Sequence, residues 1–117
     1  MSDENRLSGI VVDTSIAVHR KLGPGLLESV YEQVLAYELK RRGLSVICQQ
    51  PIAIQYDELT IENAFLADLV INDTLIVELK SVEKVDAVHK KQLLTYLKLA
   101  DKRLGLLINF GAPLLKE

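Results

Sequence analysis

Hydrophobic residues along the chain follow two different periods, and the changes between them divide the sequence into elements. Residues Glu4–Leu22 carry apolar side chains at helical spacing, and a second helical stripe runs over Leu26–Arg42. Gly23-Pro24-Gly25 separates the two stripes and breaks helical structure. Gly43 follows three cationic residues, as is typical of a left-handed cap at a helix end. These patterns predict two consecutive helices.

The middle of the chain has the composition of β-strands. Leu44–Tyr56 is rich in β-branched residues, and Pro51 within it favours an edge strand or a bulge. Thr60–Ile71 and Thr74–Val82 predict two apolar strands of a hairpin.

Helical spacing returns in the last third of the chain. Asp86 is a suitable N-cap for a third helix over Ala87–Ala100. The short apolar run Leu104–Phe110 predicts a strand buried on both faces, followed by a tail at Leu114–Glu117. The predicted order is α-α-β-β-β-α-β, which describes an α/β fold with a mixed four-stranded sheet flanked by helices. A chain of 117 residues fits a single domain spanning residues 1–117.

The amino-acid composition limits the kinds of core and functional site that the chain can form. Hydrophobic residues make up 49% of the chain and aromatic residues 5%, so the expected core is aliphatic. Cys48 is the single cysteine, which excludes a disulfide framework or a cysteine-based metal site, and we expect it to be a small buried residue. The net charge of −2 argues against a protein that coats nucleic acid, although it is compatible with an enzyme that touches a phosphate backbone locally.

No apolar run approaches the length of about 18 residues that a membrane span requires. The start of the sequence, Met1–Arg6, is polar and acidic, unlike a signal peptide. We therefore expect a cytoplasmic protein with no membrane partner.

Three charges stand late in the two strands of the predicted hairpin. Asp68 lies near the end of the first strand, and Glu78 and Lys80 alternate on one face of the second. Charged groups inside an apolar sheet are costly unless they bind something, and a divalent metal is the partner that suits two carboxylates best. A solvated polar end to an amphipathic hairpin is the alternative interpretation.

The turn between the strands decides whether the two carboxylates can meet. A two-residue turn, Asn72-Asp73, would pair Asp68 with Val77 and place Asp68 and Glu78 on opposite faces. A three-residue loop, Asn72-Asp73-Thr74, would pair Asp68 with Glu78, and Asn or Asp tolerates the left-handed backbone that it needs. The metal hypothesis therefore predicts an odd-length loop or a bulge.

Two helices could complete such a site. Gln92 and Tyr96 share one face of the third helix with His89, and that face could lie against the sheet. Glu28 stands near the start of the second helix, with Tyr31 three residues later. The alternatives are an exposed glutamine, an ordinary core tyrosine, and a glutamate that stabilises the helix dipole.

These residues stand in a pattern that resembles a known family. Residues 25–31, Gly-Leu-Leu-Glu-Ser-Val-Tyr, match the GxxExxY signature of the bacterial and archaeal family named after it. Asp68 with Glu78-Leu79-Lys80 is similar to the PD-(D/E)xK nuclease core, with Ala67 in place of the motif's proline. Residues 92–96 resemble the QxxxY motif of RecB-like nucleases, and the resemblance covers about residues 7–115.

The resemblance implies a restriction-endonuclease-like αβββαβ core and metal-dependent hydrolysis of phosphodiester bonds in DNA. It implies that Asp68, Glu78 and the Leu79 carbonyl hold Mg²⁺ or Mn²⁺. It implies that Lys80 orients the attacking water or offsets charge on the phosphate. Glu28, Gln92 and Tyr96 would act around them as further catalytic groups. Two clusters of basic residues could contact the nucleic acid, or could be ordinary solvated helix faces. The first cluster is Arg20, Lys21, Lys40, Arg41 and Arg42, and the second is Lys84, Lys90, Lys91 and Lys98.

Two other functions remain open at this point. A non-catalytic module that keeps the nuclease fold could bind nucleic acid or a protein, and the charges could form an ion-pair network that serves fold specificity alone. A small nuclease domain contacts a short stretch of duplex, so a homodimer presenting two sites is a further expectation.

Overall fold

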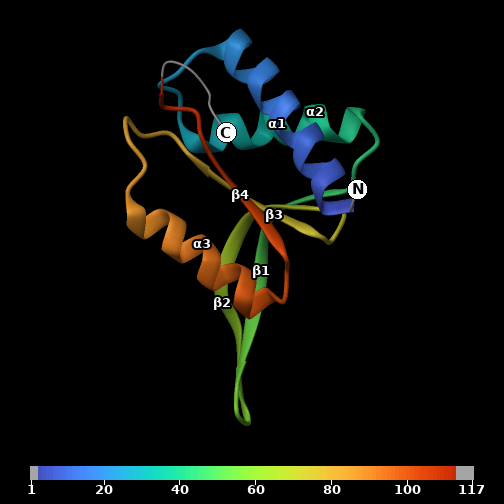
Figure 1. The fold of residues 1–117 in the computed structure, drawn as a ribbon, viewed down its shortest axis with the longest axis vertical. Coiled ribbons are helices and arrows are strands. Elements are labelled where there is room, and N and C mark those ends of the chain that lie inside the picture. The colour runs from blue at the N-terminus through green and yellow to red at the C-terminus, as the bar shows by residue number, and fades with distance from the viewer. Residues whose placement is uncertain (1–2, 113–117) are drawn as a thin grey trace.

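The computed structural model describes residues 3–112, and it contains the seven elements in the predicted order (Figure 1). The elements are α1 (Asp3–Leu22), α2 (Glu28–Arg41), β1 (Val46–Tyr56), β2 (Leu59–Ile71), β3 (Leu75–Lys80), α3 (Ala87–Ala100) and β4 (Leu104–Asn109). The tail predicted at residues 114–117 lies outside the described residues. Among residues 3–112, no helix combines the length and hydrophobicity needed to cross a membrane.

The four strands form one mixed sheet in the order β1-β2-β3-β4. β1 and β2 pair antiparallel, β2 and β3 pair antiparallel, and β3 and β4 pair parallel. A parallel pair needs a crossover connection, and α3 supplies it between β3 and β4. The predicted α/β class and the mixed four-stranded sheet flanked by helices are confirmed.

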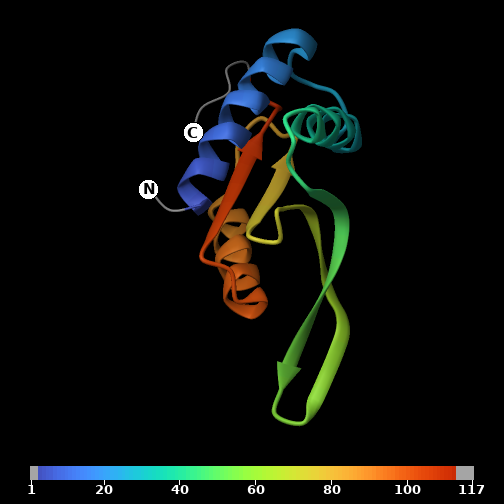
Figure 2. The same ribbon diagram turned by 90° about the vertical axis from the view of Figure 1, so that its right-hand side faces the viewer.

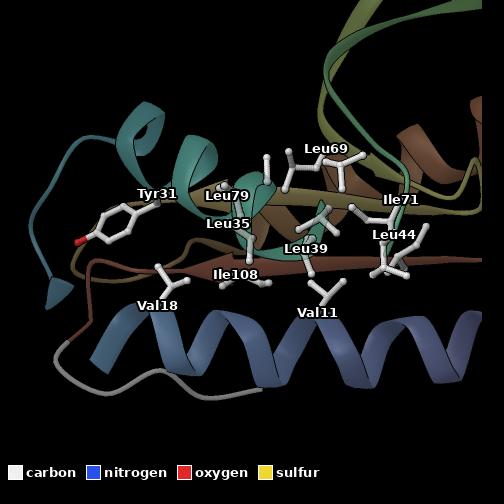
Figure 3. Packing of buried hydrophobic residues seen from close by; sticks show 14 of the residues in the cluster. Val11, Val18, Tyr31, Leu35, Leu39, Leu44, Leu69, Ile71, Leu79 and Ile108 are labelled. Carbon is white, nitrogen blue, oxygen red and sulfur yellow. The ribbon is translucent and has the colours of Figure 1, made fainter. Parts of the chain in front are cut away.

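Helices cover both faces of the sheet. α1 and α2 pack on one face, where Val11, Leu35 and Leu39 meet Leu69 and Leu79 (Figure 3). α3 packs on the other face, where its one fully buried residue, Leu93, joins a smaller cluster with the β-strand residues Val70 and Ile76. These two clusters fix both helix layers relative to β3, one of the two central strands, which carries Glu78 and Lys80.

The hairpin of β1 and β2 extends well beyond the helices (Figure 2). β2 pairs with β3 over Leu69–Ile71, whereas it pairs with β1 over a longer stretch that continues to Leu59. β1 is an edge strand, and the register shifts between Ile52 and Ile54, next to Pro51. The edge strand and the bulge that Pro51 favoured are therefore both present.

Two expectations about burial are wrong. β4 contacts the clusters on both faces but is only partly buried, because it forms the second edge of the sheet, and Ile108 is its one buried residue. An edge strand has no neighbour on one side, so water reaches most of its side chains. Cys48 is exposed rather than buried, because it lies on the other edge strand, β1.

Candidate active site

The connection between β2 and β3 is a three-residue loop. Ile71 pairs with Leu75, and Asn72, Asp73 and Thr74 lie between them. Asn72 and Asp73 both have left-handed backbones, with φ of 50° and 54°, which their side chains tolerate. The Thr74 N–H donates to the Ile71 carbonyl at 2.9 Å and closes the loop. The odd-length loop that the metal hypothesis required is confirmed.

This loop places Asp68 opposite Glu78. The described pairing of β2 with β3 runs from Ile71–Leu75 to Leu69–Val77, and the next position in the same register is Asp68 opposite Glu78. At this position the backbone pairing of β2 with β3 ends, and carboxylate side chains accept the backbone N–H groups instead. The Leu79 N–H donates to Asp68 Oδ2 at 2.8 Å, and the Asp68 N–H donates to Glu78 Oε1 at 3.4 Å. The two carboxylates therefore sit at the point where the sheet opens.

The environment of Glu78 disfavours its charged form. Burial, followed by the charge of Asp68, raises the pKa of Glu78 from its ordinary 4.5 to about 8. The Lys80 ammonium acts in the opposite direction and lowers the pKa of Glu78, but to a smaller extent. The pair thus carries negative charge that neighbouring protein groups do not fully compensate.

Helix α2 begins at Glu28, and a network of hydrogen bonds fixes the turn before it. The Tyr31 hydroxyl donates to the Gly23 carbonyl at 2.5 Å and accepts the Leu26 N–H at 3.1 Å. Ser81, directly after Lys80, donates its hydroxyl to the Leu26 carbonyl at 2.6 Å. Tyr31 is therefore a buried structural residue. Tyr31 fixes the turn before α2, and Ser81 ties that turn, and with it Glu28, to the end of β3.

Glu28 lines an open pocket of about 360 Å³ together with Asp68 and the adjoining part of β3. The pocket residues are Glu28, Ser29, Glu32, Gln49, Asp68 and Leu79. Partial burial raises the pKa of Glu32, and the charge of Asp68 raises it further, while a hydrogen bond from Gln49 opposes the change. Three acidic side chains, Glu28, Glu32 and Asp68, thus face one solvent-filled space.

Helix α3 places one of its predicted residues, Tyr96, against β2. Tyr96 stacks on Phe65 with ring centroids 3.8 Å apart. Partial burial raises the pKa of Tyr96, and the charges of Glu78 and Asp68 raise it further, so its hydroxyl lies within their electrostatic reach. Gln92 is exposed, and within residues 3–112 it makes no hydrogen bond to either carboxylate. His89 accepts the Asp86 N–H at its Nδ1 and so stabilises the start of α3.

The donor set suits a divalent cation. Asp68 and Glu78 offer hard oxygen ligands, and the Leu79 main chain lies beside them at the pocket wall. Across the described residues, no group of three or more His, Cys, Asp or Glu side chains is arranged as a complete metal site. Two carboxylates and a main-chain carbonyl leave several positions to water, which is how Mg²⁺ is usually bound.

Comparison with known proteins decides the family. A model of the PD-(D/E)XK nuclease superfamily matches residues 5–117, nearly the whole chain. The chain belongs to the PD-(D/E)XK nuclease superfamily. No curated protein and no solved structure matches the chain. The nuclease-like fold and a nucleic-acid substrate class follow from the membership, and members of the superfamily generally use divalent metal ions.

Two of the predicted basic residues of this PD-(D/E)XK protein, Arg41 and Arg42, lie apart from its carboxylates. Arg41 and Arg42 stand at the far end of α2 from Glu28, about 20 Å along the helix axis. Both guanidinium groups lie within salt-bridge distance of Glu38, at 3.2 Å and 3.5 Å. These two cations therefore do not line the pocket that contains Asp68.

Three residues that line the PD-(D/E)XK pocket were not predicted from the sequence: Ser29, Glu32 and Gln49. Glu32 lies one helical turn after Glu28, so the i, i+4 spacing could have identified it. Gln49 reaches the pocket through a left-handed backbone with φ of 52°, which strand alternation does not predict. Of the predicted residues, Glu28, Asp68 and Leu79 line the pocket. Glu78 and Lys80 lie beside it on β3, and Gln92 and Tyr96 lie on α3.

Proposed function

We propose that the protein is a metal-dependent nuclease that hydrolyses phosphodiester bonds in DNA, using Mg²⁺ or Mn²⁺. One observation carries the proposal. The three-residue loop sets Asp68 opposite Glu78 where β2 and β3 separate, with Lys80 two residues further along β3. This arrangement occurs in a chain of the PD-(D/E)XK nuclease superfamily.

In this proposal Asp68, Glu78 and the Leu79 carbonyl bind the cation. The bound cation supplies positive charge and lowers the pKa of coordinated water. The acidic pair fits such an ion, because burial and mutual repulsion already disfavour two charges there, and a cation relieves both.

The other residues of the chain act on water and phosphate. Lys80 is half-buried on the same face as Glu78, and its ammonium would orient the attacking water or offset charge that develops on the phosphate. Glu28 at the start of α2 would hold a water in the pocket. Tyr96 and Gln92, one turn apart on α3, would act on the scissile phosphate or from outside the ligand shell of the cation.

A cleavage assay tests the proposal. Plasmid, single-stranded and branched DNA, and RNA of matching sequence, are incubated with Mg²⁺ or Mn²⁺ and with EDTA. We expect cleavage of DNA that EDTA abolishes and that Asp68→Ala and Lys80→Ala each reduce by at least about 100-fold. Glu58→Ala and Arg103→Ala, at exposed positions outside the pocket and outside both basic clusters, serve as controls. Activity that survives in the Asp68 and Lys80 variants would refute the assignment.

A non-catalytic binding module is the second candidate. The exposed position of Gln92, which in the described part of the chain makes no hydrogen bond to Asp68 or Glu78, favours it. This candidate predicts that the wild-type protein binds DNA without cleaving it in either metal, and that Asp68→Ala binds equally well. The homodimer remains a separate proposal, which sedimentation of the free protein would test.

A further inference from the structure

Gln49 adopts an unusual backbone conformation directly beside the carboxylates. It lies in β1 between Cys48, which pairs with Leu69, and Gln50, which pairs with Ala67, so it stands across from Asp68. Its φ of 52° is left-handed, although glutamine has no special tolerance for that region. Residues in such conformations cluster at functional sites, where the surrounding structure holds them in place.

The Gln49 side chain joins two acidic residues from different elements. Its Nε2 group donates to Glu32 Oε1 on α2 at 2.6 Å and to Asp68 Oδ1 on β2 at 3.1 Å. The other oxygen of Asp68, Oδ2, accepts the Leu79 N–H at 2.8 Å. Both oxygens of Asp68 are therefore held by donors, which fixes the plane of the carboxylate.

The chemistry of the donor matters as much as its position. An amide holds two carboxylates close together without cancelling their charge, whereas a lysine or arginine there would neutralise them. The pocket lined by Glu28, Glu32 and Asp68 thus keeps its net negative charge. Stability alone gives little reason for this arrangement. The Gln49 hydrogen bonds are exposed, and a bond of that kind stabilises a fold about as much as a left-handed conformation costs.

We propose that Gln49 is a positioning residue that holds Asp68 and Glu32 in the orientation that binds the divalent cation. Glu32 joins the site through this bridge, either at the ion or at one of its waters. The proposal rests on the metal-dependent nuclease function proposed above. Groups that orient a ligand from outside the coordination sphere commonly change metal affinity by 10-fold to 100-fold when they are removed.

The test compares metal affinity with metal-free stability in two variants. Gln49→Gly removes the amide and accepts φ of 52° without strain, and Gln49→Asn keeps an amide that is one methylene too short to bridge both carboxylates. Gln55→Ala is the matched control, because Gln55 is exposed on the same strand and hydrogen-bonds to Asp57 and Thr60 instead. Mn²⁺ affinity is measured by titration calorimetry, and urea unfolding is measured in EDTA.

We expect both Gln49 variants to bind Mn²⁺ at least about tenfold more weakly than the wild type, with Gln55→Ala unchanged. We also expect metal-free Gln49→Gly to be at least as stable as the wild type, because glycine relieves the left-handed backbone. The proposal is overturned if Gln49→Gly and Gln49→Asn bind Mn²⁺ like the wild type. It is equally overturned if they lose stability while the folded fraction keeps full affinity, since Gln49 would then support the fold alone.

A wild-type protein that binds no Mn²⁺ would instead refute the proposed nuclease function, and with it this role for Gln49. The two failures are distinguished by the wild-type titration, which comes first.

Discussion

Replacing Glu78 by glutamine is expected to stabilise the metal-free protein at alkaline pH. Glutamine has nearly the same shape, and its amide oxygen can still accept the Asp68 N–H. It removes the negative charge that burial and Asp68 disfavour. A substitution that abolishes a proposed metal ligand should therefore make the empty protein more stable.

The sign follows from the proton balance. Glu78 has a pKa of about 8 in the folded protein and an ordinary value of 4.5, so between these pH values the folded state holds a proton that the unfolded state has lost. The free energy of unfolding of the wild type therefore falls as pH rises from about 5 to about 8. This pKa difference corresponds to about 5 kcal/mol at ~1.36 kcal/mol per pH unit. Glu78 is only half-buried, and screening by water reduces the expected effect to about 2 kcal/mol.

Urea unfolding in EDTA at pH 5.5 and pH 8.5 measures the effect. Between the two pH values, we expect the free energy of unfolding of Glu78→Gln to fall by about 2 kcal/mol less than that of the wild type. Asp68→Asn should also weaken the pH dependence of the free energy of unfolding, but by less than Glu78→Gln. It removes the charge of Asp68, which is the second cause of the raised pKa of Glu78, and leaves the burial of Glu78 in place. Equal pH dependence in the wild type and in Glu78→Gln would refute the reasoning. Added Mg²⁺ should stabilise the wild type at pH 8.5 and leave Glu78→Gln nearly unchanged.

Four further substitutions test other parts of the structure. Tyr31→Phe removes the two hydrogen bonds that fix the turn before α2, and thermal or urea unfolding should show a loss of about 1–3 kcal/mol. Gly111→Ala would place a Cβ 2.3 Å from the backbone of Val82 and should destabilise by about 2 kcal/mol or more, whereas Gly9→Ala, with open space in α1, should stabilise by about 0.5–1 kcal/mol. Tyr96→Phe keeps the stacked ring, so stability should change by less than about 0.5 kcal/mol. If the Tyr96 hydroxyl contacts the phosphate as proposed, its loss should lower the cleavage rate by about tenfold.

The order of elements could be predicted because each boundary has a local chemical signal. Asp86 at the start of α3 and Gly43 after α2, with φ of 85°, occupy the caps that their residue types favour. The hairpin register was predictable for a different reason. The sequence allowed two loop lengths, and the chemistry of Asp68 and Glu78 required the odd one, which the structure has.

Burial and long-range contacts were harder to predict. The apolar composition of β4 resembles that of a central strand. Its partial exposure depends on the order of strands in the sheet, which the local sequence does not predict. Gln49 is a stronger example. Its place in the pocket depends on a backbone torsion in β1 and on carboxylates 17 and 19 residues away, on α2 and β2. The alternation of side chains along β1 predicts neither the left-handed torsion of Gln49 nor its contacts with the two carboxylates.

The hydrogen bond from Leu79 to Asp68 gives the site a built-in spectroscopic reporter. Most strand amides donate to a carbonyl, whose charge does not change, but the Leu79 N–H donates to a carboxylate at the pocket wall. Its ¹⁵N and ¹H chemical shifts should therefore respond directly to a cation that binds Asp68. A titration with Mg²⁺ in an NMR tube would show occupancy at this one resonance before any substrate is added.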